Sequence, residues 1–100
     1  MNAEDLTVIR SPAACQIKAD CHDLASEVGV PLESVSWMRG LPHTNTPFHL
    51  KITVSGINAI REVEFTQDQI LGYPTGHTTT EVQEKIRAAL ESILPDLEEN

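Results

Sequence analysis

The sequence predicts an α+β fold: a two-layer sandwich in which both helices cover one face of a three-stranded antiparallel sheet. Apolar residues recur at helical spacing near both ends of the chain, and they alternate with polar residues in three segments between those ends. The element order is therefore α-β-β-β-α, and stacking the two layers buries the single apolar stripe of each helix against the sheet. At 100 residues the chain has the length of one domain, 1–100, with an expected core over 6–95 and an acidic tail at 96–100.

The first helix is expected over residues 12–28. Ser11 can cap the free N–H groups of the first turn, and Pro12 loses nothing at the first helical position. Apolar residues then recur at spacings of three and four, which places them on one face: Ala14, Ile17, Cys21, Leu24 and Val28. Gly29 ends the helix, and Pro31 follows two residues later.

Two strands are expected next. The segment 32–41 is rich in β-formers and alternates around Val35 and Trp37, and the segment 40–47 has the turn residues of a loop. Residues 48–55 alternate most clearly, with apolar side chains at Phe48, Leu50, Ile52 and Val54.

Residues 6–9, which precede the first helix, are a candidate for an additional edge strand of the sheet.

The third strand is expected over 59–65, after a turn at 56–58, with Val63 and Phe65 pointing inward. In this register Lys51 lies opposite Glu64 on the outer face, where opposite charges attract. The interpretation leaves one face of the sheet uncovered.

The C-terminal half of the chain carries two capping-box patterns. Thr66 with Gln69 predicts a short helical turn over 67–71, stopped by Gly72. Thr78 with Glu81 predicts the start of a second long helix, whose apolar residues follow at helical spacing: Val82, Ile86, Ala89, Leu90, Ile93 and Leu94. We expect Pro95 to end this helix and the acidic residues after it to fray, because carboxylates repel the negative end of the helix dipole.

The net charge of −8 comes from 15 acidic and 7 basic residues, and it is unevenly distributed. Residues 34–61 contain no Asp or Glu. The basic and imidazole side chains of this stretch form a candidate anion-binding set: Arg39, His43, His49, Lys51 and Arg61. The other interpretation is that they are solvated surface charges that aid solubility.

Candidate chemistry elsewhere is sparse. Cys15 lies on the helix surface near Lys18, which could lower the pKa of its thiol. Cys15 and His22 are about 10 Å apart along the helix axis, too far to share one metal ion. Glu62 and Glu64 point to the same side of the third strand, about 6.5–7 Å apart at Cα, which is the solvated outer face. We therefore expect no catalytic residues, no metal site and no cofactor.

The segment 72–78 contains two glycines and precedes a helix, but it lacks the spacing and the lysine of a phosphate-binding loop. The helix N-terminus and the run of Thr78, Thr79 and Thr80 still offer donors to an anion. The alternative is that these threonines only cap the helix.

The element order resembles that of double-stranded-RNA-binding domains. Leu41-Pro42-His43 lies between the first two strands, where that family has a loop whose histidine is directed at RNA. The family also grips phosphates with lysines at the start of its last helix, and this chain has threonines and glutamates over 78–84 instead. With a net charge of −8, the electrostatic attraction to a nucleic acid duplex is weak, so nucleic acid is not the expected partner.

The sequence as a whole favours a small non-catalytic protein-interaction or assembly module that acts through its open sheet face or an edge strand. The candidate partner-binding residues are Met38, His49, Lys51, Thr53, Glu62 and Glu64. The partner is an unknown protein or a second copy of the chain. The alternative is a nucleic-acid or other polyanion binder that uses the acid-free stretch 34–61.

The chain is expected to be cytoplasmic, with no membrane association. No apolar run exceeds three residues, and the first residues have no basic segment followed by an apolar one. Two cysteines are too few for a disulfide framework.

Overall fold

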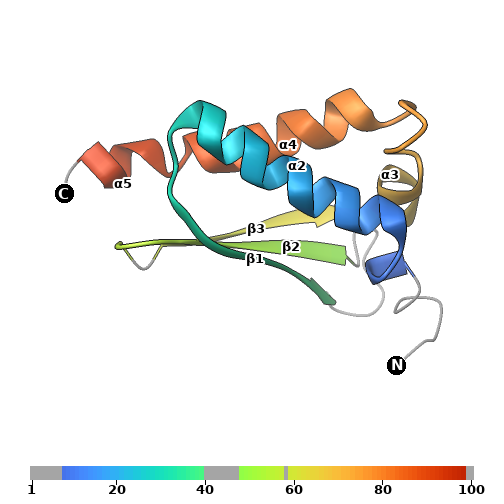
Figure 1. Ribbon diagram of the computed structural model, residues 1–100, viewed down its shortest axis with the longest axis horizontal. Helices are drawn as coiled ribbons and strands as arrows, with labels where there is room; N and C mark the ends of the chain where they lie inside the picture. The colour runs from blue at the N-terminus through green and yellow to red at the C-terminus, as the bar shows by residue number, and fades with distance from the viewer. Residues whose placement is uncertain (1–7, 40–47, 58, 99–100) are drawn as a thin grey trace.

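The computed structural model describes residues 8–39, 48–57 and 59–98, and it confirms the α+β fold. Three antiparallel strands form one sheet in the order β1-β2-β3. The two long helices, α2 and α4, pack against each other and lie on the same side of this sheet (Figure 1). The elements are α2 (Pro12–Val28), β1 (Leu32–Arg39), β2 (Phe48–Val54), β3 (Ile60–Phe65), α3 (Gln67–Leu71), α4 (Thr79–Glu91) and α5 (Leu94–Glu98).

Helix α2 begins and ends where its capping residues predict. The side chain of Ser11 accepts a hydrogen bond from the backbone N–H of Ala14 at 3.2 Å, and Pro12 occupies the first turn. Gly29 ends the helix with φ at 92°, a left-handed conformation that glycine adopts without steric cost. Its N–H donates to the carbonyl of Ala25 at 2.9 Å, which satisfies one of the last helical carbonyls.

The expected pairing of Lys51 with Glu64 is wrong. Lys51 lies opposite Glu62, and Glu64 lies opposite His49. The hairpin closes at a hydrogen bond of 2.9 Å from the N–H of Val54 to the carbonyl of Ala59, and this closure sets the register two residues away from the expected one. Because side chains alternate with a period of two, a two-residue shift changes the partners but leaves every side chain on its expected face.

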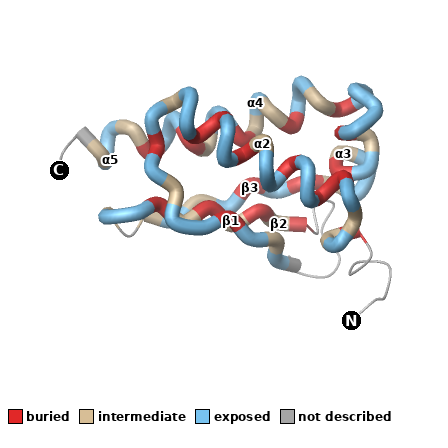
Figure 2. Tube along the Cα trace, viewed as in Figure 1, coloured by how far each residue is buried: buried red, intermediate tan, exposed pale blue. Residues whose placement is uncertain are grey.

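The core lies between the helices and the inner face of the sheet (Figure 2). Ile52 from β2 and Leu90 from α4 are both fully buried, as the apolar patterns predict. The side chains of β2 alternate strictly between buried and half-buried. Trp37 reaches under α2, where its indole N–H donates to the carbonyl of Ala14 at 3.0 Å. Its ring lies 5.7 Å from the ring of Phe65.

The capping box at Thr66 is confirmed, but the one expected at Thr78 is not formed. Thr66 and Gln69 exchange side-chain and backbone hydrogen bonds at the start of α3. The side chain of Thr78 makes no capping bond, and its hydroxyl instead donates to the carbonyl of Gln69 at 2.6 Å. A buried hydroxyl needs a partner, and the end of α3 supplies one that local sequence does not reveal.

The helix expected to end at Pro95 stops earlier, at Glu91. Ile93 is fully buried between α4 and α5, and Pro95 lies in the first turn of α5, where a missing N–H is tolerated. The fraying expected for the acidic tail is therefore wrong for residues 96–98, which are helical, and residues 99 and 100 lie outside the described residues. Leu94 and Leu97 pack against the core and offset the unfavourable end charges.

Residues 8 and 9 are helical, so the extra edge strand expected at residues 6–9 is not found there. Residues 6 and 7, the loop expected at 40–47 and the end of the first strand expected at 40–41 lie outside the described residues. Val8 is buried, and its carbonyl accepts the hydroxyl of Ser11 at 2.7 Å. This contact joins the start of the described chain to the cap of α2.

Candidate functional site

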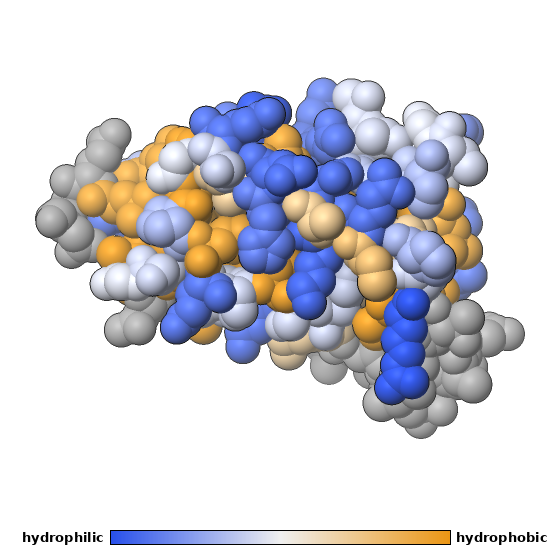
Figure 3. All heavy atoms as spheres, in the orientation of Figure 1, coloured by the Kyte–Doolittle hydropathy of each residue, from blue (hydrophilic) through white to orange (hydrophobic). Residues whose placement is uncertain are grey.

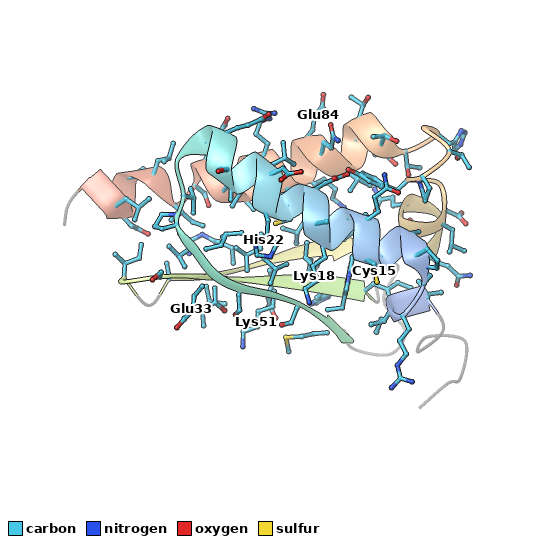
Figure 4. The ribbon with its side chains drawn as sticks, in the orientation of Figure 1. Cys15, Lys18, His22, Glu33, Lys51 and Glu84 are labelled. Atoms are coloured by element: carbon cyan, nitrogen blue, oxygen red, sulfur yellow. The ribbon has the colours of Figure 1, made fainter. Side chains whose placement is uncertain are left out.

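The face of the sheet opposite the helices carries nine side chains in three rows, which we call the open face. Each row runs across β1, β2 and β3 through paired residues: Met38, His49 and Glu64; Ser36, Lys51 and Glu62; Ser34, Thr53 and Ile60. Met38 is 40% exposed and Ile60 is 49% exposed, at opposite corners of the face. Lys51 projects away from the helices (Figure 4). The candidate partner-binding residues therefore share one surface.

Charge on the open face is arranged by strand. In the paired rows β1 contributes only uncharged side chains, β2 contributes the basic and imidazole groups, and β3 contributes two glutamates. Outside these rows, Glu33 of β1 also points to this face, at the irregularity between Leu32 and Ser34 (Figure 4). The Nε2 atom of His49 lies 3.5 Å from Oε1 of Glu64, and Lys51 occupies the next row opposite Glu62. Lys51 and Glu62 thus place opposite charges across β2 and β3, which is the stabilising arrangement for a cross-strand pair.

The candidate anion-binding set is not assembled on this face. His49 and Lys51 belong to it, but Arg61 pairs with the buried Ile52 and so points to the helix side of the sheet. There its guanidinium donates to the hydroxyl of Ser92 at 3.0 Å and lies 3.3 Å from Asp96. His43 and the side chain of Arg39 lie outside the described residues.

One backbone hydrogen bond determines which backbone groups face outward at the two edges of the sheet. Val54 pairs with Ala59 through its backbone, so alternate residues of β2 point their backbone groups toward β3 and the others toward β1. On β1 this leaves the N–H and C=O of Val35 and Trp37 facing outward. Val35 is nevertheless only 4% exposed, because α2 packs over this edge. The β1 edge is therefore covered at Val35, whereas Trp37 is only half-buried.

The flank of α2 above β1 carries Cys15, Lys18 and His22 (Figure 4). Hydrophilic side chains lie over the middle of this side of the molecule, and hydrophobic surface shows between them and near α5 (Figure 3). Cys15 is exposed and Cys21 is buried, as the helical spacing predicts. Burial raises the pKa of the Cys21 thiol to about 12, so this thiol is unreactive at neutral pH. Within 8–39, 48–57 and 59–98, no three His, Cys, Asp or Glu side chains are placed to hold a metal ion.

The β3 edge is different. By the same alternation, the backbone N–H and C=O groups of Ile60, Glu62 and Glu64 point away from β2. The guanidinium of Arg61 donates to the carbonyl of Ile60 at 3.1 Å, and the ammonium of Lys85 donates to the carbonyl of Glu64. Two basic side chains therefore cap the two ends of this edge. Lys85 was not among the expected site residues, because only the packing of α4 brings it to β3.

A shallow groove of about 410 Å³ runs between the β3 edge and α4. Its lining residues are Glu62, Val63, Glu64, Lys85, Ala88 and Ala89. The two alanines have the smallest side chains of this set, and they leave the space beside Val63 open. The ammonium of Lys85 also lies 5.0 Å from the centre of the Phe65 ring, which holds it at one end of the groove.

The segment 72–78 is a structural connection whose hydroxyls are already engaged. Thr75 donates to the carbonyl of Gly72 at 3.0 Å, and Thr79 donates to the carbonyl of Tyr73 at 2.6 Å. Thr78 donates to Gln69 as described above, so these hydroxyls support the backbone of the loop and of α3. The arrangement favours a role in connecting α3 to α4 over an anion site, and Thr78 does not cap α4 through its side chain.

No protein-family model, curated protein or solved structure matches the chain. Among the helices described, none combines the length and the apolar character that a membrane span needs. Function is therefore inferred from the geometry of the chain's own residues.

Proposed function

We propose that the chain is a small non-catalytic protein-interaction module whose contact surface is its sheet. The observation that carries this proposal is the open face, on which nine side chains from three strands lie without a helix over them (Figure 1). In a two-layer α+β domain, the uncovered face and the edges of the sheet are the surfaces on which other chains pack or add strands.

The separation of the basic residues favours a protein partner over a polyanion. Lys51 lies on the open face and Arg61 on the helix side, where Ser92 and Asp96 already engage its guanidinium. Glu62 and Glu64 adjoin Lys51 and His49 on the open face. Glu33 lies on the same face (Figure 4), so a phosphate chain crossing it would meet more acidic groups than basic or imidazole groups, which opposes binding.

The test uses the immobilised chain to capture proteins from a lysate of its source cell. The wild-type chain is compared with a sheet variant, Lys51→Glu with Thr53→Glu, which changes the charge at the centre of the open face. The control is a helix variant, Arg87→Glu with Thr80→Glu, which makes the same charge changes on exposed positions of α4. Chemical denaturation checks that both variants fold.

A protein retained by the wild-type chain and the helix variant, but not by the sheet variant, supports the proposal. Equal retention by all three chains, or loss in the helix variant alone, overturns it. Retention of nucleic acid that disappears steeply with added salt overturns it in favour of polyanion binding.

A further inference from the structure

We infer that the groove between β3 and α4 receives an extended segment of a partner protein as a fourth strand, and that this segment alternates basic and apolar residues. The inference rests on the proposed function and names the site and the chemistry of the partner. It starts from the β3 edge, where the backbone groups of Glu62 point outward between the two capped carbonyls. A strand edge of this kind offers a ladder of hydrogen bonds to another chain.

The alternation of the partner segment follows from the two faces that a fourth strand would have. Side chains of the fourth strand that lie opposite Glu62 and Glu64 share the outer face of the sheet with those carboxylates. Basic side chains there form favourable cross-strand pairs. The intervening side chains point to the helix side, into the groove beside Val63, Ala88 and Ala89, where apolar groups are buried.

A second copy of this chain does not fit as the fourth strand beside β3. Two β3 strands related by a two-fold axis pair more than one of the outward-facing residues Ile60, Glu62 and Glu64 only in registers centred on Arg61, Glu62 or Val63. These registers place Arg61 opposite Arg61, Glu62 opposite Glu62, or Glu62 opposite Glu64. Like charges directly opposite each other are destabilising, and the net charge of −8 adds repulsion between copies. A basic segment of a different protein meets neither obstacle.

Lys85 regulates access to this edge. Its ammonium donates to the carbonyl of Glu64, which a fourth strand needs as an acceptor. The partner must therefore displace Lys85, and the lysine discriminates against weakly complementary segments. Arg61 caps the other end of the edge at Ile60, so the unobstructed stretch is short. Basic caps at both ends also protect the free protein from edge-to-edge aggregation.

The experiment titrates the full chain with a capped five-residue peptide in which lysine and valine alternate. Amide chemical shifts and hydrogen exchange are followed by NMR. We expect shifts and slowed exchange at the amides of Glu62 and Glu64, with the amide of Val35, which is buried on the β1 edge, unchanged. A scrambled peptide of the same composition is the control, because it keeps the charge but not the alternation.

Four variants sharpen the test. Glu62→Lys should weaken binding about three- to tenfold by placing like charges opposite each other. The control, Glu84→Lys, makes the same change of charge on the side of α4 away from the sheet (Figure 4) and should have a smaller effect. Lys85→Met should tighten binding about two- to tenfold by removing the competing hydrogen bond. The control Arg87→Met removes the same charge on the other flank of α4, where Arg87 lies 3.4 Å from Glu27.

Equal binding of both peptides, equal effects of the paired variants, or shifts confined to other surfaces would overturn the inference. Absence of peptide binding overturns it as well. If peptide binding fails while capture still depends on Lys51 and Thr53, the groove inference is wrong and the proposed function stands. If capture also shows no dependence on the sheet, both are wrong.

Discussion

The hydroxyl of Tyr73 donates a hydrogen bond of 2.5 Å to Oδ2 of Asp20, which is 53 positions earlier in the chain. The hydroxyl oxygen of Tyr73 also accepts a hydrogen bond of 3.1 Å from the side-chain amide of Gln83. Tyr73 is only 1% exposed, so these contacts join α2, the loop before α4, and α4 itself at a buried point. Burial, followed by the hydrogen bond to Asp20, raises the pKa of Tyr73 to about 12.

Replacing this hydroxyl should destabilise the fold. We expect Tyr73→Phe to lower the free energy of unfolding by about 1–3 kcal/mol, because a hydrogen bond to a charged group is lost and Gln83 loses its acceptor. Urea denaturation measures the change. Asp20→Asn keeps an acceptor for the hydroxyl and should cost less. A loss below about 0.5 kcal/mol for Tyr73→Phe would show that this contact contributes little, as a surface position does.

The two layers of the core make a second prediction. Ile52→Ala and Leu90→Ala should each lower the free energy of unfolding by about 2–5 kcal/mol, since both side chains are fully buried. Leu71→Ala is the control, because this leucine is 45% exposed and should cost much less. Equal, small losses at all three positions would contradict the packing described here.

The two cysteines should differ in reactivity. A thiol reagent added to the native protein should modify Cys15, which is exposed, and leave Cys21 intact, since it is buried and its pKa is raised to about 12. Mass spectrometry after proteolysis locates the label. Both sites should react once the protein is unfolded in denaturant. Equal rates at both thiols in the native protein would mean that α2 is not docked on the sheet.

Stability should fall at alkaline pH. The pKa of Cys21 rises from 9.0 to about 12 on burial, and the pKa of Tyr73 rises from 10.0 to about 12. A raised pKa means that the folded state holds its proton more tightly, so this contribution is complete below pH 9 and is lost as the pH rises from 9 toward 12. Denaturation at a series of pH values across this range gives the free energy of unfolding as a function of pH. This free energy should fall less steeply with pH in the Cys21→Ala/Tyr73→Phe double variant than in the wild-type protein. An identical slope in the two proteins would exclude these groups as the cause.

Nucleic acid should bind weakly. Lys51 and Arg61 lie on opposite sides of the sheet, and Asp96 engages Arg61, so few basic groups can meet phosphates together. We expect titration with double-stranded RNA or DNA at about 150 mM salt to show no binding tighter than the non-specific range of about 10⁻⁴–10⁻⁶ M. Sub-micromolar affinity that falls on replacement of Arg39 and Lys51 would overturn the protein-partner proposal.

Local patterns predicted the two long helices, the three strands and the short helix at 67–71, but not the end of α4 at Glu91 or the separate helix α5. The bounds of α2 follow from Ser11, Pro12 and Gly29, which act on backbone groups within one turn of them. In β2, in β3 and from Ser34 onward in β1, the face on which a residue lies follows from its parity, so these side chains could be assigned even with the wrong register. The irregularity between Leu32 and Ser34 breaks this alternation, and the sequence did not predict that Glu33 lies on the open face. The exposure of Cys15 and the burial of Cys21 follow from the helical period in the same way.

The partners of the polar side chains depend on contacts between segments that are distant in sequence, and only the tertiary structure determines them. From the sequence, the hydroxyl of Thr78 could be expected to cap α4. In the structure Thr78 is buried, and its hydroxyl donates to the carbonyl of Gln69. The sequence places Arg61 among the candidate anion-binding residues, whereas in the fold its guanidinium contacts Ser92 and Asp96. Lys85 reaches the carbonyl of Glu64 only because α4 crosses the β3 edge, 21 positions away in sequence. Periodicity specifies which side of an element is buried, whereas the partner of a polar group depends on which segments the collapsed chain brings within hydrogen-bonding distance.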